Sequence, residues 1–161
     1  MDKLFTRVNV MNWLSFGERT EQMGALRVDI RPGVADEIAD IRKLPYVNNS
    51  FDGVECYHVL EHLILTEAAV AAGELWRVLK PGGVLKMAVQ DMLKCAETLL
   101  SGNVQVMWNI YSPSPEAALR HRWGYTFETL KELLSDAQFR NITRVASHPA
   151  DPHEIRIKAI K

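Results

Sequence analysis

Cysteine and long apolar runs are scarce in this chain of 161 residues. Its two cysteines, Cys56 and Cys95, are too few for a disulfide scaffold or for a metal site built from thiolates. No stretch approaches the roughly 18 apolar residues that a membrane-spanning helix needs. The first residues carry charges and lack the apolar core of a signal peptide. We therefore expect a cytoplasmic protein that does not enter a membrane.

Excess charge of either sign is also missing. The chain has 19 lysines and arginines against 20 aspartates and glutamates, a formal net charge of −1 at pH 7. Nucleic acids and anionic membranes both attract proteins with a surplus of positive charge, so neither is expected as a partner. With 47% apolar and 24% charged residues, the composition is that of a folded globular protein. Residues 1–161 are expected to form a single domain.

Several short segments have the pattern of β-strands, because they are rich in valine or aromatic residues and are bounded by turn residues, such as Pro81-Gly82-Gly83 before the third. These segments are residues 25–30, 51–57 and 84–89. Residues 142–147 and 154–160 predict two more strands, and in the second of these apolar residues alternate with polar ones. This alternation is typical of an antiparallel pair at a sheet edge.

Helical patterns separate the predicted strands. Apolar residues recur at helical spacing in residues 66–79, 92–100 and 126–137. Thr126 and Thr129 are spaced as a loose capping box for the last of these helices. Strands that alternate with helices predict an α/β fold with a mostly parallel sheet. Residues 102–123 are the least regular, and we expect a mobile loop or lid there.

Acidic residues stand where ligands bind in such a fold, beyond the carboxyl ends of the strands. Asp29 ends the segment 25–30, and a carboxylate there can accept hydrogen bonds from a ribose diol. Asp40 can accept from the exocyclic amine of a base, while Ile41 packs on the ring. Either aspartate can equally well cap its own turn, so the residues alone leave both roles open.

Further polar residues follow two other predicted strands. His58, Glu61 and His62 come after residues 51–57, and Gln90 with Asp91 comes after residues 84–89. The spacing of His58, Glu61 and His62 matches the His-x-x-Glu-His pattern of one class of zinc peptidase. That pattern needs all three residues on one helix, and here His58 directly follows a predicted strand. We therefore expect no metal at this position.

Two longer sequence segments indicate a family more specifically than any single residue does. VDIRPGVADEIADIRKLPYVNNSFDGVECYHVLEHL and ELWRVLKPGGVLKMAVQDM resemble class I S-adenosylmethionine-dependent methyltransferases, and in particular the small Methyltransf-11-like enzymes. The likeness continues at residues 121–142 and 153–161. It implies a Rossmann-like three-layer α/β sandwich whose mostly parallel sheet ends in an antiparallel C-terminal hairpin. It also implies S-adenosylmethionine as cofactor and methyl transfer to a small-molecule or saccharide acceptor.

The resemblance assigns roles to individual residues. Asp29, beside Ile30, would hold the ribose hydroxyls, Asp40 with Ile41 would flank the adenine, and Tyr57 with His58 would line the methionine end. The candidate acceptor side would comprise Glu61, His62, Gln90, Asp91, Arg122 and Trp123. His58 or His62 would act as general base for an acceptor that must lose a proton, because an imidazole titrates near neutral pH.

The chain departs from the family where the first strand should enter a glycine-rich turn. Residues 11–18 stand there, with Ser15, Phe16 and Gly17 at the expected cofactor position, and only Gly17 keeps the family's glycine. Glycines in such a turn let the backbone approach the methionine carboxylate. Three consequences are open: a tighter pocket, a turn in which Ser15 and backbone amides replace the glycines, or a degenerate module that binds a ligand or partner without catalysis.

Overall fold

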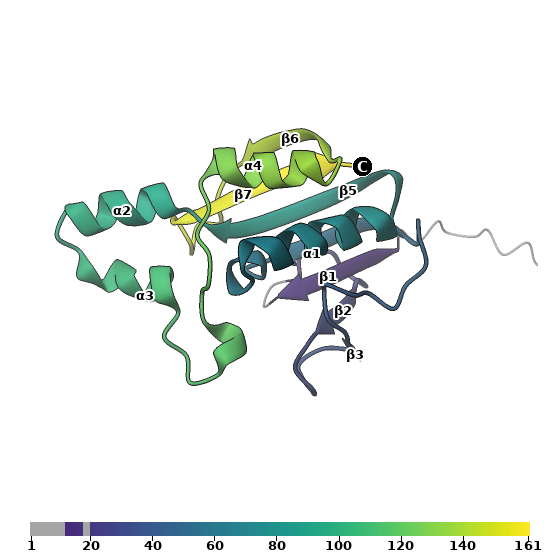
Figure 1. Cartoon of the computed structure of the whole chain (residues 1–161), viewed down its shortest axis with the longest axis horizontal. Coiled ribbons are helices and arrows are strands. Elements are labelled where there is room, and N and C mark those ends of the chain that lie inside the picture. Colours follow the sequence, from purple (N-terminus) through teal and green to yellow (C-terminus); the bar gives the residue numbers. More distant parts are fainter. Residues whose placement is uncertain (1–11, 18–19) are drawn as a thin grey trace, which may run out of the picture.

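Seven strands form one sheet in the computed structural model, which describes residues 12–17 and 20–161 (Figure 1). Across the sheet the strands run in the order β3-β2-β1-β4-β5-β7-β6. The strands are β1 (Trp13–Gly17), β2 (Leu26–Asp29), β3 (Glu37–Ile38), β4 (Phe51–Tyr57), β5 (Leu79–Gln90), β6 (Arg140–Val145) and β7 (Glu154–Ile160). All neighbours pair in parallel except β7, which is antiparallel to β5 and to β6. The predicted parallel sheet with an antiparallel hairpin is confirmed.

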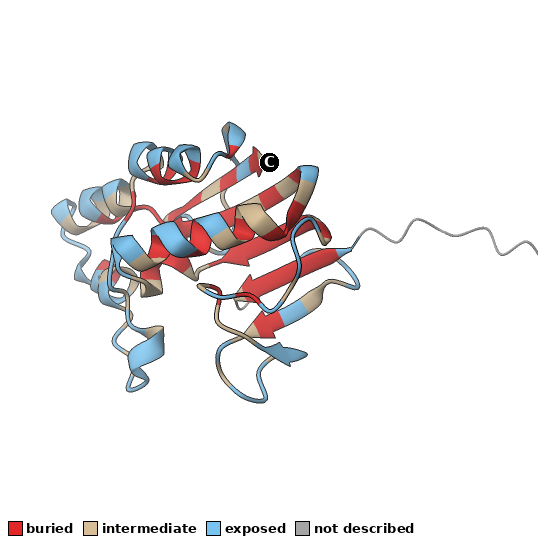
Figure 2. Ribbon diagram, turned by 45° about the vertical axis from the view of Figure 1, so that its right-hand side comes forward, coloured by how far each residue is buried: buried red, intermediate tan, exposed pale blue. Residues whose placement is uncertain are grey.

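One face of this sheet carries the apolar core. Strand residues that share this face, such as Leu14, Val54 and Leu85, are fully buried. They pack in one cluster with residues of α1 (Leu65–Val78) and α4 (Phe127–Asp136). Both helices lie over this face (Figures 1 and 2). Their apolar residues recur every three to four positions, so each helix can bury one side against the sheet.

The opposite face of the sheet is polar along its middle row. Ser15, Glu55 and Lys86 lie side by side there on β1, β4 and β5. Glu55 is fully buried, and it accepts hydrogen bonds from the backbone amides of Glu21 and Gln22, which belong to the connection between β1 and β2. Of the three layers expected, the described residues thus supply the sheet and one helical layer.

The remaining helices lie outside this layer. α2 (Met92–Leu100) and α3 (Met107–Tyr111) project from the carboxyl end of β5 (Figure 1). Three short 3-10 helices, η1 (Leu60–His62), η2 (Val104–Val106) and η3 (Ala117–Leu119), complete the structure. Within the described part of the chain, no helix has both the length and the apolar character needed to cross a lipid bilayer.

The observed elements follow the predicted ones closely, and differ at the start of β5 and within residues 102–123. β5 begins at Leu79, directly after α1, and runs through the Pro-Gly-Gly turn that was expected to precede it. The last two strands form the predicted antiparallel pair at one edge of the sheet, with β6 outermost and β7 between β5 and β6. The irregular segment 102–123 contains η2, α3 and η3.

Candidate active site

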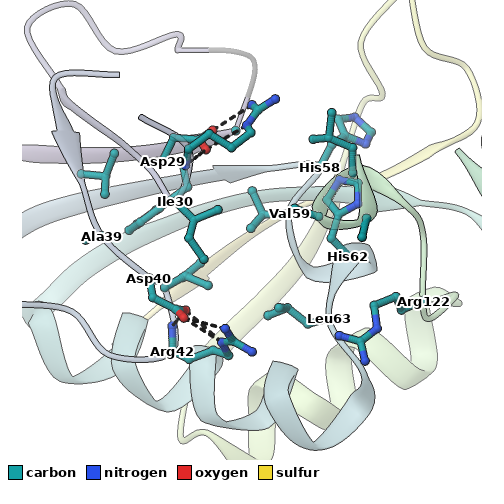
Figure 3. Close-up of a pocket in the computed structure, with 18 residues that line it drawn as sticks. Asp29, Ile30, Ala39, Asp40, Arg42, His58, Val59, His62, Leu63 and Arg122 are labelled. Carbon is teal, nitrogen blue, oxygen red and sulfur yellow. Dashed lines mark hydrogen bonds and ion pairs between the residues drawn. The ribbon is translucent and has the colours of Figure 1, made fainter. Parts of the chain in front are cut away.

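A cavity of about 320 Å³ opens at the carboxyl ends of β1, β2 and β4 (Figure 3). Three parts of the chain form its walls: the ends of β1 and β2 with the turns on either side of β3, the residues after β4, and a later segment that includes η3. The lining residues are Phe16, Gly17, Val28, Asp29, Ile30, Arg31, Ala39, Asp40, Ile41, Arg42, His58, Val59, His62, Leu63, Ala117, Ala118, Leu119 and Arg122.

Gly17 shapes the floor of the cavity, where β1 ends against β4. Its φ of +90° lies in the left-handed region that favours glycine. A Cβ atom at this position would overlap the carbonyl oxygen of Tyr57, the residue with which Gly17 is paired. The sheet therefore requires glycine here. Residues 11 and 18 of the expected turn lie outside the described residues.

Asp29 ends β2 and forms a compact turn with Arg31. One carboxylate oxygen, Oδ1, accepts from the backbone amide of Arg31 at 2.8 Å and from its Nε at 3.0 Å. The other, Oδ2, accepts from Nη2 at 3.0 Å. Burial by itself would raise the pKa of Asp29, but the hydrogen bonds and charge of Arg31 outweigh it and hold this pKa below its ordinary value. Asp29 is therefore a carboxylate at neutral pH.

Asp40 repeats this arrangement with Arg42 on the neighbouring turn. Its carboxylate accepts from the backbone amide of Arg42 at 2.9 Å and from Nη2 at 2.6 Å. The hydrogen bonds and charge of Arg42 outweigh burial and lower the pKa of Asp40. Arg42 also donates through Nη1 to Glu67 of α1 at 2.5 Å.

Neither arginine was singled out from the sequence. A signal for both exists in the repeated triplet Asp-Ile-Arg, at residues 29–31 and 40–42. In each triplet the isoleucine lines the cavity between an aspartate and an arginine that bind each other.

His58 lies among three carboxylates just after β4. Its Nδ1 is 2.9 Å from Glu61 Oε1, and its Nε2 is 3.3 Å from Glu154 Oε2 and 3.4 Å from Asp151 Oδ2. Burial by itself would lower the pKa of His58, but these carboxylates outweigh it and raise the pKa. A carboxylate at each ring nitrogen favours the protonated form of His58, in which both nitrogens donate, and that form is a proton donor and not a base.

Two metal arrangements can be compared with this geometry. The His-x-x-Glu-His pattern needs one helix, but His58 has a φ of +55° outside η1, whereas Glu61 and His62 are part of it. His58, Asp151 and Glu154 do place ligand atoms within 4.8 Å of one another. An imidazolium that binds two carboxylates has the same spacing, so these distances alone do not require a metal ion.

His62 has a different environment on the same wall of the cavity. Its Nδ1 lies 3.3 Å from the carbonyl oxygen of Arg120, which can only accept, so Nδ1 carries the proton. In the neutral ring Nε2 is then a lone-pair acceptor. The ring lies against His121 with centroids 5.0 Å apart. Burial and the neighbouring histidines lower the pKa of His121 despite the charge of Glu61, so His121 adds no positive charge beside His62 at neutral pH.

The segment that carries η3 closes the third side of the cavity. The backbone amides of Arg122 and Trp123 both donate to the carbonyl oxygen of Glu61, at 2.7 and 3.2 Å. The Arg122 side chain donates to Glu67 Oε2 at 3.1 Å. Glu67 therefore binds Arg42 on one wall and Arg122 on the other.

Known proteins share both sequence and architecture with this chain. A family model described as a methyltransferase domain matches residues 19–87. An S-adenosylmethionine-dependent methyltransferase from Thermotoga maritima superposes with a TM-score of 0.65 at 15% identity, over 94% of this chain and 82% of that one. A second, from Archaeoglobus fulgidus, gives 0.62 at 14% identity over 94% and 86%. Residues 19–87 thus match a methyltransferase domain, and the chain as a whole has the fold of these methyltransferases.

The resemblance of the sequence to methyltransferases is thus confirmed. A third structure, the 1,6-didemethyltoxoflavin-N1-methyltransferase of Burkholderia thailandensis with bound S-adenosylhomocysteine, superposes with a TM-score of 0.56 at 18% identity. The overlap covers 85% of this chain and 60% of that one. At these identities the superpositions show a common fold. No curated protein matches the sequence.

Most residues expected at the methyltransferase site do line the cavity. The structure brings together Phe16, Gly17, Asp29, Ile30, Asp40, Ile41, His58, His62 and Arg122. Ser15 and Tyr57 lie elsewhere, because alternate residues of a strand face opposite sides of the sheet. The Ser15 hydroxyl is 3.0 Å from that of Thr20, and the Tyr57 hydroxyl donates to Glu21 at 3.1 Å.

Four residues expected on the acceptor side also lie outside the cavity wall. Glu61 is fully buried behind His58. Gln90 accepts a hydrogen bond from Asn109, and Asp91 caps α2 and binds Arg144 at 2.5 Å. Trp123 is 44% exposed.

Proposed function

We propose that this methyltransferase binds S-adenosylmethionine in the cavity between β2 and β4 and transfers its methyl group to a small-molecule or saccharide acceptor. The observation that carries the proposal is the position of Asp29 and Asp40 at adjacent strand ends, with Ile30 and Ile41 beside them in one cavity. In doubly wound sheets, nucleotide ligands bind at this edge.

The residues present fit such a cofactor. The cavity volume of about 320 Å³ is within the range of small-molecule sites. The isoleucines offer apolar contact for a base, and the two aspartates offer acceptors for hydroxyl or amino hydrogens. The imidazolium of His58, at the end of the cavity beyond Gly17, suits a carboxylate group of a ligand.

Methyl transfer demands little further chemistry from the chain. The bound sulfonium supplies an activated methyl group, so the protein contributes mainly position and exclusion of water. An acceptor hydroxyl or protonated amine must also lose a proton. His62 suits that task better than His58, because Nε2 of His62 is an acceptor whereas both nitrogens of His58 donate to carboxylates.

Two structural neighbours support a small-molecule acceptor. The Burkholderia enzyme was solved with 1,6-didemethyltoxoflavin, and human N-acetylserotonin methyltransferase was solved with S-adenosylmethionine. The second superposes at a TM-score of 0.58 and 17% identity, over 85% of this chain and 40% of that one.

Calorimetric titration with S-adenosylmethionine and S-adenosylhomocysteine tests the cofactor site. We expect micromolar binding that Asp29→Ala weakens by about 1.5–3 kcal/mol, because charge-assisted hydrogen bonds to the ribose are lost. Asp52→Ala is the matched control. Asp52 also accepts a backbone amide and binds a cation, Lys80, but at the start of β4 and outside the cavity wall.

Two results would contradict the proposal. Folded wild-type protein that binds neither ligand at millimolar concentration would favour the non-catalytic module. Equal losses in Asp29→Ala and Asp52→Ala would mean that Asp29 acts through stability and not through contact with the ribose.

A further inference from the structure

Arg31 binds the carboxylate of Asp29, the group that the ribose of the proposed cofactor would contact. Asp29 ends β2 with only 15% of its side chain exposed, and Arg31 folds back on it as the strand ends. The guanidinium binds through two nitrogens, Nε to Oδ1 and Nη2 to Oδ2, both at 3.0 Å. This two-point geometry gives the strongest form of arginine–carboxylate pairing.

The acceptor capacity of Asp29 is nearly used up by this contact. A carboxylate offers about four lone-pair positions. The backbone amide and Nε of Arg31 take two on Oδ1, and Nη2 takes one on Oδ2. About one position is left, whereas a vicinal diol that binds one carboxylate through both hydroxyls needs two.

The Arg31 side chain also lies in the space where a ligand of Asp29 would sit. It lines the same cavity as Asp29 and Ile30, both of which are labelled in Figure 3. Arg42 makes the equivalent contact with Asp40 but is additionally bound to Glu67 on α1. The contacts between Asp29 and Arg31 lie within one turn of the chain.

We propose that Arg31 competes with the ribose for Asp29, so that the Asp29–Arg31 ion pair sets the affinity of the cavity for nucleosides. The inference rests on the proposed function, because it takes a ribose as the ligand of Asp29. Binding of the diol to both oxygens displaces Nη2 from Oδ2. Arg31 thereby lowers cofactor affinity and reduces the preference of the cavity for a complete diol.

The test compares wild-type protein with Arg31→Ala, using S-adenosylhomocysteine as the ligand. We expect Arg31→Ala to bind about tenfold more tightly, the equivalent of one charge-assisted hydrogen bond. Arg31→Lys should tighten binding less, since an ammonium cannot make the two-point contact. Arg27→Ala is the matched control. It removes a cation from β2, just before the Asp29–Arg31 turn, but the Arg27 side chain binds the Val34 carbonyl outside the cavity wall. The affinity of this variant for S-adenosylhomocysteine should equal that of wild type.

A second readout separates competition from a general loosening of the turn. Adenosine and 2′-deoxyadenosine are titrated into both proteins, followed by NMR chemical shifts. The ratio of the affinities for adenosine and 2′-deoxyadenosine should increase in Arg31→Ala, because both ribose hydroxyls can then reach Asp29. Loosening alone would change the affinity for the two nucleosides equally.

The outcomes distinguish this inference from the function on which it rests. Equal or weaker binding of S-adenosylhomocysteine by a folded Arg31→Ala variant, with wild type binding, overturns the competition and leaves the proposed function intact. Binding by neither protein overturns both. If Arg31→Ala does not fold, the affinity of Arg31→Lys for S-adenosylhomocysteine is compared with that of wild type instead, and equal or weaker binding again overturns the competition.

Discussion

Gly17 shows how one residue joins the fold to the site. It ends β1 at a φ of +90°, faces Tyr57 of β4 and lines the cavity. We expect Gly17→Ala to lower the free energy of unfolding by about 1–3 kcal/mol from backbone strain, with a further loss from the overlap with the Tyr57 carbonyl. Gly24→Ala is a matched control, since Gly24 has a φ of +76° with no atom within 4 Å of the added Cβ. Urea denaturation that finds equal losses would show that contact with β4 is unimportant.

Individual site residues could be predicted only in part. Asp29 and His58 were found because they stand at the ends of predicted strands, and both line the cavity, as does Asp40. Ser15 and Phe16 are neighbours on β1, so their side chains cannot reach the same face, and only Phe16 borders the cavity. When a family pattern assigns consecutive strand residues to a site, only alternate ones can therefore line it.

At the scale of elements, helix α1 connects two walls of the cavity through Glu67. This carboxylate binds Arg42 at 2.5 Å and Arg122 at 3.1 Å, and it accepts the backbone amide of Ile64 at 3.2 Å. Arg42 is 35% exposed and Arg122 is 46% exposed, so solvent weakens both pairs. Together they hold the η3 segment against the wall that carries Asp40.

We expect Glu67→Gln to release the η3 segment without unfolding α1, because glutamine keeps an acceptor for the Ile64 amide. Hydrogen exchange at residues 117–122 should become faster, and bound S-adenosylhomocysteine should dissociate about two- to fivefold faster. Glu74→Gln is the control, since Glu74 lies on the same helix and binds Arg77 away from the cavity. An unchanged hydrogen-exchange rate in Glu67→Gln would mean that the backbone hydrogen bonds to Glu61 are sufficient to hold the η3 segment.

Helices and strands themselves were largely predictable. Periodic apolar residues placed α1, α2 and α4 within two residues of their observed ends, and Thr126 and Thr129 do cap α4 reciprocally. The contacts within residues 102–123 could not be predicted, because that segment is held by bonds to Glu61 and Glu67 from distant parts of the chain. Such contacts leave no periodic pattern.

At the scale of the whole molecule, His58 links the end of β4 to β7, which is not its neighbour in the sheet. Its folded-state pKa is raised above the unfolded value of about 6.5. The folded state therefore binds this proton more tightly. The resulting stabilisation is complete below about pH 6.5 and is lost as the pH rises through the folded-state pKa.

Urea denaturation across about pH 6 to pH 9 should reveal this link. We expect the free energy of unfolding of wild type to fall with rising pH more steeply than that of His58→Asn. Asparagine tolerates the positive φ at this position and does not titrate. Parallel curves for the two proteins would show that Glu61, Asp151 and Glu154 do not hold His58 as a cation.

The position of β7 affects how the chain can be synthesised and folded. β7 follows β6 in the chain but lies between β5 and β6, where it pairs with β5 from Val84 to Gln90. A nascent chain that stops before residue 154 would expose the edge of β5 and leave β6 without a partner. Long-range pairing of this kind slows folding, so the sheet reaches its final width only when β7 has left the ribosome.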